Sequence, residues 1–170
     1  AVLAFDRSTG KLRWRQEWEG YVKVPFFAKA NGDWIRATPA YADGRLFVAG
    51  MRDVLVCFEA ETGQELWRVD FVKDHSKPVP DFGFVSSPLV LGEAVYVQAG
   101  AAFVKLDART GRVLWRTLED EGGMWGSAFS SPVAARLAGV DQLIVQTRTT
   151  LAGVSPEDGR VLWQQPIKAF

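Results

Sequence analysis

The chain has 170 residues, of which 48% are hydrophobic, and its 20 basic and 20 acidic side chains leave no formal net charge. This balance gives no electrostatic reason to expect nucleic acid or an anionic membrane as a partner, and no apolar run approaches the roughly 20 residues of a membrane span. One cysteine excludes an internal disulfide, and a single cysteine with a single histidine provides no zinc-type ligand cluster.

The chain opens directly on a strand-like pattern, Val2, Leu3 and Phe5, without an initiator methionine or a signal segment. We therefore expect it to be a piece of a longer protein whose targeting information lies outside this segment. Residues 1–24 are expected to hold the last two strands of a first four-stranded unit. That unit is therefore only half present.

Three full units are expected to follow, over residues 33–75, 82–120 and 124–168. The Asp43-Gly44 pair in the first of them is a strong hairpin signal. No helical periodicity of useful length is present. The expected strands cover residues 36–42, 45–50, 54–59 and 65–71, then 84–91, 94–99, 103–107 and 113–117, and finally 127–137, 142–147, 151–154 and 161–166.

A polar turn ending in glycine, with tryptophan four residues later, recurs about every 50 residues. Such a period is typical of solenoids and propellers. Each copy reads as a hairpin whose glycine takes a backbone angle that a Cβ resists. One unit cannot bury its apolar face alone, so the tryptophans are expected to pack neighbouring units together. The repeated pairs are Gly10 and Trp14, Gly63 and Trp67, Gly111 and Trp115, and Gly159 and Trp163.

These features predict an all-β fold, a partial β-propeller of four-stranded antiparallel blades that forms a single incomplete domain over residues 1–170. Propellers close with about 4–8 blades, so further blades, or pairing of exposed strand edges with another chain, are expected. The pairs Thr38-Pro39, Ser87-Pro88 and Ser131-Pro132 fit the innermost strand of a blade, because proline cannot donate into a ladder. Cys57, in mid-strand, is expected to be a small buried residue.

Antiparallel strand order places the glycine turns at one end of the blades and the long, varied links at the other. Varied links on a rigid scaffold are where binding usually resides. An aromatic-rimmed polar funnel is one interpretation, and loop-packing aromatics with solvated charges is the other. Trp34, Arg36, Trp125 and Arg148 are the expected main contributors to binding, since tryptophan and arginine dominate interface energetics. The candidate binding face comprises Asp33, Trp34, Arg36, Arg52, Asp81, Phe82, Ser87, Trp125, Ser131, Arg148 and Thr149.

No catalytic constellation emerges from the sequence. His75, the only histidine, lies in a polar stretch and is expected to be a solvated loop residue. No nucleophile context accompanies it. Asp53, Asp81 and Glu119 are too scattered to be proposed as an acid–base pair.

The first copy of the repeat resembles the tryptophan-docking motif of the pyrroloquinoline-quinone-type (quinoprotein-like) β-propellers of bacteria. Ala4, Asp6, Thr9, Gly10 and Trp14 match that motif in full, and the later copies diverge from it. The resemblance implies either of two roles. The family contains eight-bladed alcohol dehydrogenases that hold quinone (PQQ) and calcium, and also non-enzymatic relatives, including a lipoprotein scaffold for outer-membrane barrel assembly.

The chain lacks the adjacent cysteine pair of the dehydrogenases, and no residue here matches their aspartate base or calcium ligands. We therefore expect a non-enzymatic binding or scaffold module, periplasmic or secreted, that takes a protein, small-molecule or glycan partner on its link face. No cofactor is expected in this segment. The alternative is a fragment of a quinone-dependent alcohol dehydrogenase, with PQQ and calcium in the full-length protein.

Overall fold

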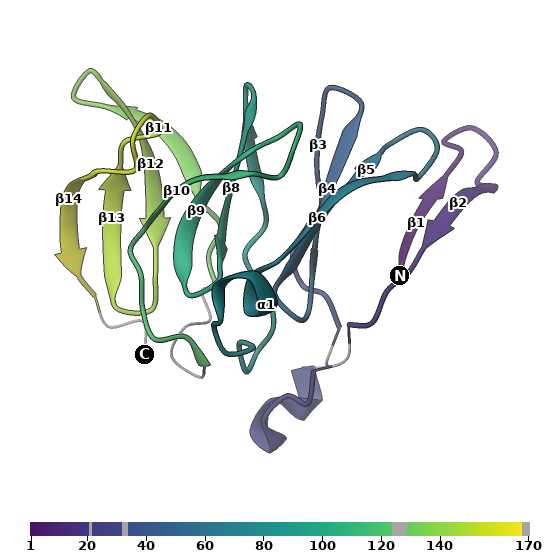
Figure 1. Ribbon diagram of the computed structural model, residues 1–170, viewed down its shortest axis with the longest axis horizontal. Helices are drawn as coiled ribbons and strands as arrows, with labels where there is room; N and C mark the ends of the chain where they lie inside the picture. The colour runs from purple at the N-terminus through teal and green to yellow at the C-terminus, as the bar shows by residue number, and fades with distance from the viewer. Residues whose placement is uncertain (21, 32–33, 124–128, 168–170) are drawn as a thin grey trace.

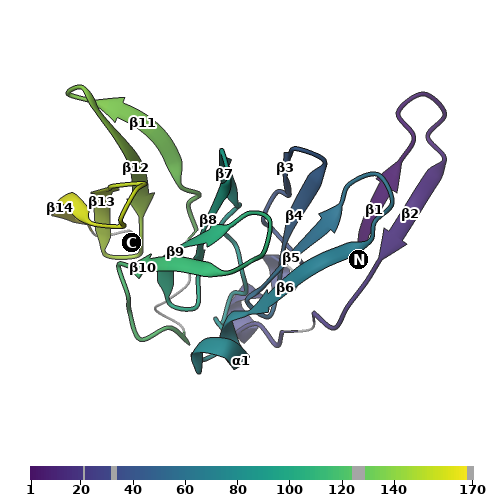
Figure 2. The same cartoon turned by 45° about the horizontal axis from the view of Figure 1, so that its top comes forward.

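The computed structural model describes residues 1–20, 22–31, 34–123 and 129–167, and it confirms the all-β propeller fold. One two-stranded and three four-stranded antiparallel sheets lie side by side along an arc (Figures 1 and 2). In each four-stranded sheet the spatial order of the strands follows the chain order. The number of further blades and the domain boundaries stay predictions.

Fourteen strands make up the sheets within the described residues. The half blade holds β1 (Val2–Phe5) and β2 (Leu12–Gln16). The second blade holds β3 (Ala40–Ala42), β4 (Arg45–Gly50), β5 (Val54–Glu59) and β6 (Glu65–Asp70). The third holds β7 (Leu89–Leu91), β8 (Ala94–Ala99), β9 (Ala102–Asp107) and β10 (Val113–Thr117). The fourth holds β11 (Val133–Leu137), β12 (Val140–Gln146), β13 (Thr150–Val154) and β14 (Val161–Pro166).

The first strand of each full blade begins later than the sequence predicted, after the proline of its Thr-Pro or Ser-Pro pair. The residues before the proline bond to the next blade instead of to their own sheet. Thr38 N–H donates to Ser87 Oγ, and Ser87 N–H donates to Ser131 Oγ, each over 2.9 Å. These bonds link consecutive blades beside the innermost strands, so the ladder of each blade starts only beyond them.

The described parts of the links include two short helices, where the sequence indicated none. The 3-10 helix η1 covers Phe26–Asn31, and α1 covers Phe71–His75. The Asp70 side chain accepts a hydrogen bond from Lys73 N–H, which caps α1 and ends β6 one residue earlier than expected. No helix in the described ranges is long and apolar enough to cross a membrane.

Each tryptophan followed by another blade lies against the turn glycine of that blade. A Cβ placed on Gly63 would lie 2.6 Å from Cδ2 of Trp14, and one on Gly111 would lie 2.7 Å from Cε3 of Trp67. Only glycine leaves room for the indole, and each of these glycines also has a positive φ, near +75°. The repeated glycine therefore serves the turn and the contact between blades at once.

In the first two contacts, each indole N–H donates to the equivalent backbone carbonyl in the glycine turn of the following blade. Trp14 Nε1 donates to the carbonyl of Ala60 at 3.0 Å, and Trp67 Nε1 donates to that of Ala108 at 3.1 Å. These bonds satisfy a buried polar group that would otherwise cost stability. The predicted structural role of the recurring tryptophans is thus seen as a contact between successive blades.

The third contact differs because Lys105 replaces the small residue that precedes the turn in earlier copies. Its Nζ donates to the carbonyl of Pro156 at 2.7 Å, and Tyr96 Oη donates to the same oxygen at 3.2 Å. The indole of Trp115 still covers Gly159, but its N–H is buried without a partner among the described residues. The Lys105 ammonium group therefore binds the Pro156 carbonyl, whose equivalents in the first two contacts accept from the indole N–H.

The cores lie between blades, as the stacking interpretation requires. The largest joins the second and third blades and includes Phe47, Leu55, Val97 and Leu106, all nearly inaccessible. Free Cys57 is fully buried in this core, as predicted. No blade follows Trp163 within the described residues. Trp163 is 37% exposed, and its indole N–H donates to Gln142 Oε1 of the same sheet.

Candidate functional site

The links and the β4–β5, β8–β9 and β12–β13 hairpins gather at one end of the blades, which we call the link face. The glycine turns lie at the other end, the turn face. Figure 1 shows η1 and α1 below the sheets, on the link face, with the turns above. This separation confirms the two faces expected from the antiparallel strand order.

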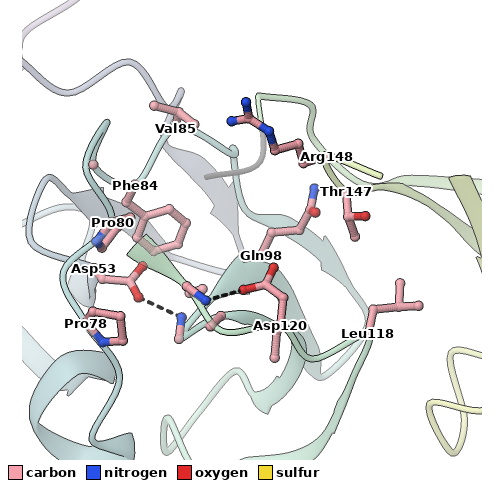
Figure 3. Close-up of a pocket in the computed structure, with 16 residues that line it drawn as sticks. Asp53, Pro78, Pro80, Phe84, Val85, Gln98, Leu118, Asp120, Thr147 and Arg148 are labelled. Atoms are coloured by element: carbon pink, nitrogen blue, oxygen red, sulfur yellow. Dashed lines mark hydrogen bonds between the residues drawn. The ribbon is translucent and has the colours of Figure 1, made fainter. Parts of the chain in front are cut away.

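A small cavity on the link face has a buried carboxyl group in its wall (Figure 3). Asp53 lies at the tip of the β4–β5 hairpin and is 4% exposed. Its Oδ2 accepts a hydrogen bond of 2.6 Å from Gly100 N–H, at the tip of the β8–β9 hairpin. Arg116 Nη2 donates to the carbonyl of the same Gly100, also at 2.6 Å. Asp53 therefore joins the second blade to the third through the backbone of Gly100.

The cavity, which we call the Asp53 cavity, has a volume of about 30 Å³. Such a volume holds about two water molecules. Figure 3 shows Asp53 on one side of it, and Gln98, Thr147 and Arg148 on the other. An organic cofactor requires a pocket roughly ten times larger or more. The described residues also contain no group of three or more histidine, cysteine, aspartate or glutamate side chains that could hold a metal. The residues that line the Asp53 cavity therefore do not fit quinone and calcium. The absence of a cofactor from this segment stays a prediction.

Burial raises the pKa of the Asp53 carboxyl to about 7. The negative charges of Asp70 and Asp120 act in the same direction, while the Gly100 hydrogen bond and Arg116 act against it. Burial disfavours the ionised form because the carboxylate loses its hydration. A carboxyl group with this pKa could exchange protons near neutral pH, but a cavity of this size admits little more than water as the other reactant.

The protonation of Asp53 predicts an unusual pH dependence of stability. The folded protein holds this proton more tightly than the unfolded chain, whose aspartate pKa is near 3.8. The contribution of Asp53 to the free energy of unfolding should therefore fall as the pH rises from about 4 to about 7, by at most about 4 kcal/mol. Asp53→Asn keeps an oxygen that can accept from Gly100 N–H and should abolish this decline.

Urea unfolding of the wild type and Asp53→Asn at pH 5.5 and pH 8 measures the effect. Burial lowers the pKa of His75, which gives a contribution of the opposite sign near pH 6. The informative quantity is therefore the difference between the two proteins at each pH, since His75 is common to both. An equal difference at both pH values would show that Asp53 is ionised throughout this range.

A row of phenylalanine rings is the second feature of the link face. Phe26 and Phe27 come from η1, Phe82 from the link that follows α1, and Phe129 from the link before β11. The ring centroids are 5.6 Å apart between Phe26 and Phe27, 6.2 Å between Phe27 and Phe82, and 5.4 Å between Phe82 and Phe129. The exposed fractions are 84% for Phe26, 59% for Phe27 and 52% for Phe129. We call these four residues the phenylalanine row.

The candidate face from the sequence is divided by the structure. Asp33 and Trp125 lie outside the described residues. Phe82 belongs to the phenylalanine row, and Arg148 lines the Asp53 cavity. Trp34 and Thr149 are exposed, while Arg36 and Asp81 are half-buried. Arg52 forms an ion pair of 3.0 Å with Glu19. Ser87 and Ser131 accept the interblade hydrogen bonds described above.

His75 is not a solvated loop residue, so that prediction was wrong. It ends α1 and is half-buried, and its ring stacks on Phe71 at a centroid distance of 5.7 Å. The sequence also missed Phe129 and the burial of Asp53. The aromatic content of the links was the only sequence signal for Phe129. The polar sequence of the β4–β5 hairpin tip gave no signal that Asp53 is buried.

Comparison with known proteins places this geometry in context. A family model described as the outer membrane protein assembly factor BamB matches residues 1–170. BamB from Shewanella oneidensis is 28% identical over 113 residues, which cover 66% of this chain and 26% of that protein. The chain thus spans only about a quarter of that curated relative.

Two solved structures show the same fold at 16% identity. A europium-containing methanol dehydrogenase superposes with a TM-score of 0.66 over 95% of this chain and 37% of its own. BamB from Moraxella catarrhalis superposes with a TM-score of 0.62 over 96% of this chain and 44% of its own. The repeated glycine–tryptophan contacts, the stacked four-stranded sheets and the full-length match together show that the chain belongs to the quinoprotein-like repeat family described by the outer membrane protein assembly factor BamB.

Proposed function

We propose that this chain is a non-enzymatic binding or scaffold module of a bacterial envelope protein, periplasmic or secreted, and that its link face binds a protein partner. The phenylalanine row carries the proposal. It presents exposed aromatic rings from three separate links on one continuous surface. Contiguous exposed apolar surface on a folded domain is typical of a protein interaction site.

The row is suited to binding because its rings hold one another in place. Phe82 is half-buried and contacts Phe27 on one side and Phe129 on the other. Rings that are already packed lose less conformational freedom when a partner covers them, so more of the burial energy appears as affinity. Trp34, 63% exposed in the link after η1, adds a further aromatic side chain to this end of the blades.

The family of this chain supports a scaffold role, since matching relatives are named as factors of outer membrane protein assembly. Because the chain spans a minority of their length, the role of the complete protein is part of the proposal. The small Asp53 cavity and the donor set around it favour the non-enzymatic reading over the quinone-dependent dehydrogenase.

Replacing Phe27 and Phe82 by serine in the complete protein should weaken partner binding at least tenfold, because each change removes a central apolar contact. Tyr41→Ser is the matched control, since Tyr41 is 67% exposed but lies on β3, outside the row. Affinity for a partner recovered from the envelope, measured by biolayer interferometry, provides the comparison. An equal loss of partner affinity in the control and in the row variants would show that the phenylalanine row is not part of the interface.

A second measurement addresses the dehydrogenase alternative. Titration of the complete protein with quinone and calcium, followed by absorbance, should show no stoichiometric uptake. Stoichiometric uptake of both would contradict the non-enzymatic proposal and favour the dehydrogenase.

A further inference from the structure

An arginine lies in the cleft between the second and third blades, at the turn face. Arg45 is the first residue of β4 and is half-buried. Its Nε–H is buried and has no hydrogen-bond acceptor within the described part of the chain. A buried polar group left without a partner costs about 1–3 kcal/mol, and more when it is charged. No described residue therefore offsets the burial of this Nε–H.

A cavity of about 240 Å³ adjoins this guanidinium, and we call it the Arg45 cavity. Phe47 and Val90 form part of its apolar wall, and Ala108 and Arg109 of the β9–β10 turn also line it. Three carboxylates line the same cavity: Asp43 and Glu93 are exposed, and Asp107 is half-buried and accepts a hydrogen bond from Thr110 Oγ1. The volume lies just below the roughly 300–1,000 Å³ of ordinary ligand pockets, so a small molecule would fit.

The repeat supplies an internal comparison for Arg45. In the second blade Arg45 pairs with Ala42 across the β3–β4 turn, and in the third blade Ala94 pairs with Leu91 at the same place. Ala94 is apolar and 6% exposed, and it packs in the core between the third and fourth blades. The stacking of blades therefore does not require an arginine at this position. Its presence in one cleft only, among the clefts described, needs another reason.

We propose that the Arg45 cavity binds a small zwitterion, a carboxylate that also carries an ammonium group, of the size of a small amino acid. Arginine presents parallel N–H groups in a fork that matches a carboxylate, and the bound carboxylate would supply the acceptor that Nε lacks. Asp43 and Glu93 would receive the ammonium group. The three carboxylates of the cavity outnumber its two arginines, Arg45 and Arg109, and so disfavour a phosphate dianion, which sets the expected selectivity. This site lies opposite the link face and does not depend on the function proposed there.

Isothermal titration of the chain with glycine, sodium acetate and inorganic phosphate tests the proposal. Glycine should bind saturably, acetate more weakly, and phosphate should not bind detectably. Arg45→Gln should weaken glycine binding at least about tenfold, since a charge-assisted forked contact is lost. Arg112→Gln is the control, because Arg112 is exposed near the same turns but does not line the cavity. Its affinity should equal that of the wild type.

Thermal unfolding without ligand separates a binding defect from a folding defect. Arg45→Gln removes the half-buried charge and the Nε–H that is unpaired among the described residues, and should leave the melting temperature unchanged or higher. If that variant fails to fold, Arg45→Lys keeps the charge but lacks the fork, and should also bind glycine about tenfold more weakly. Absence of saturable glycine binding to the wild type, or equal affinity in the Arg45 variants, would overturn the site. Tighter binding of phosphate than of glycine would overturn the ligand class.

Discussion

Gly111→Ala is expected to lower the free energy of unfolding by about 2–5 kcal/mol, which combines left-handed backbone strain with overpacking. Gly111 has a φ of +74°, which alanine adopts only at a cost. The added Cβ would also lie 2.7 Å from Cε3 and 2.8 Å from Cδ2 of Trp67. The indole must then move away from the turn, and its hydrogen bond to the carbonyl of Ala108 is strained as well. Urea unfolding followed by tryptophan fluorescence measures the loss.

Gly10→Ala is the matched control for this prediction. Gly10 occupies the same turn position with a φ of +68°, but a Cβ there would meet nothing within 4 Å. This variant should cost only the backbone strain, about 1–2 kcal/mol. Gly44, with a φ of +75° and open space, provides a second control within a full blade. Equal losses for all three variants would mean that the indole plays no part.

Trp67→Ala is expected to cost about 3–5 kcal/mol, as for other core tryptophan truncations. The substitution removes the ring that covers Gly111, its contact with Phe47 at a centroid distance of 5.8 Å, and the hydrogen bond to Ala108. The opening lies along the largest core, between the second and third blades. Thermal and urea unfolding of the variant measure the cost.

Trp163→Ala tests whether that cost comes from the contact between blades. Trp163 occupies the same repeat position, but it is 37% exposed, and it lies against Gly153 and Gln142 of its own sheet. Its truncation should cost about 1–2 kcal/mol, from partial burial and one hydrogen bond. A loss as large as that of Trp67→Ala would show that the tryptophans stabilise single blades.

The fold could be predicted from the sequence because the residues that form the glycine–tryptophan contact between blades recur at a regular spacing. A glycine that must accept an indole and a tryptophan that must reach the next turn are both fixed in type and spacing, so their recurrence shows. The first strands were predicted too long for a definable reason. Thr38 and Ser87 look like strand residues, but their N–H groups donate to hydroxyl groups of the next blade.

The candidate site could be predicted only in outline. Varied links indicated the end of the blades where the phenylalanine row lies, and Phe82 was selected. The contacts between Phe27, Phe82 and Phe129 could not be seen, because they join three links that are distant in sequence. The burial of Asp53 could not be predicted, because nothing local indicates that Gly100 of another blade donates a hydrogen bond to it. The phenylalanine row and the burial of Asp53 both depend on contacts between different blades, and the sequence of a single repeat does not specify those contacts.

Lys105 shows the same limit within the repeat itself. Its divergence from the small residues at the equivalent positions could be seen in the sequence. The consequence could not, because the Pro156 carbonyl that it takes from the Trp115 indole belongs to the next blade. A departure from a repeat thus marks where a contact changes without showing which atoms are involved.

A double-mutant cycle between Trp67 and Gly111 tests the interblade contact most directly. If the indole rests on the glycine, Gly111→Ala should cost only about 1–2 kcal/mol once Trp67 is alanine, since strain alone remains. The two substitutions should then be less than additive, with a coupling energy of about 1–3 kcal/mol. Strictly additive losses would contradict the claim that this ring joins neighbouring blades.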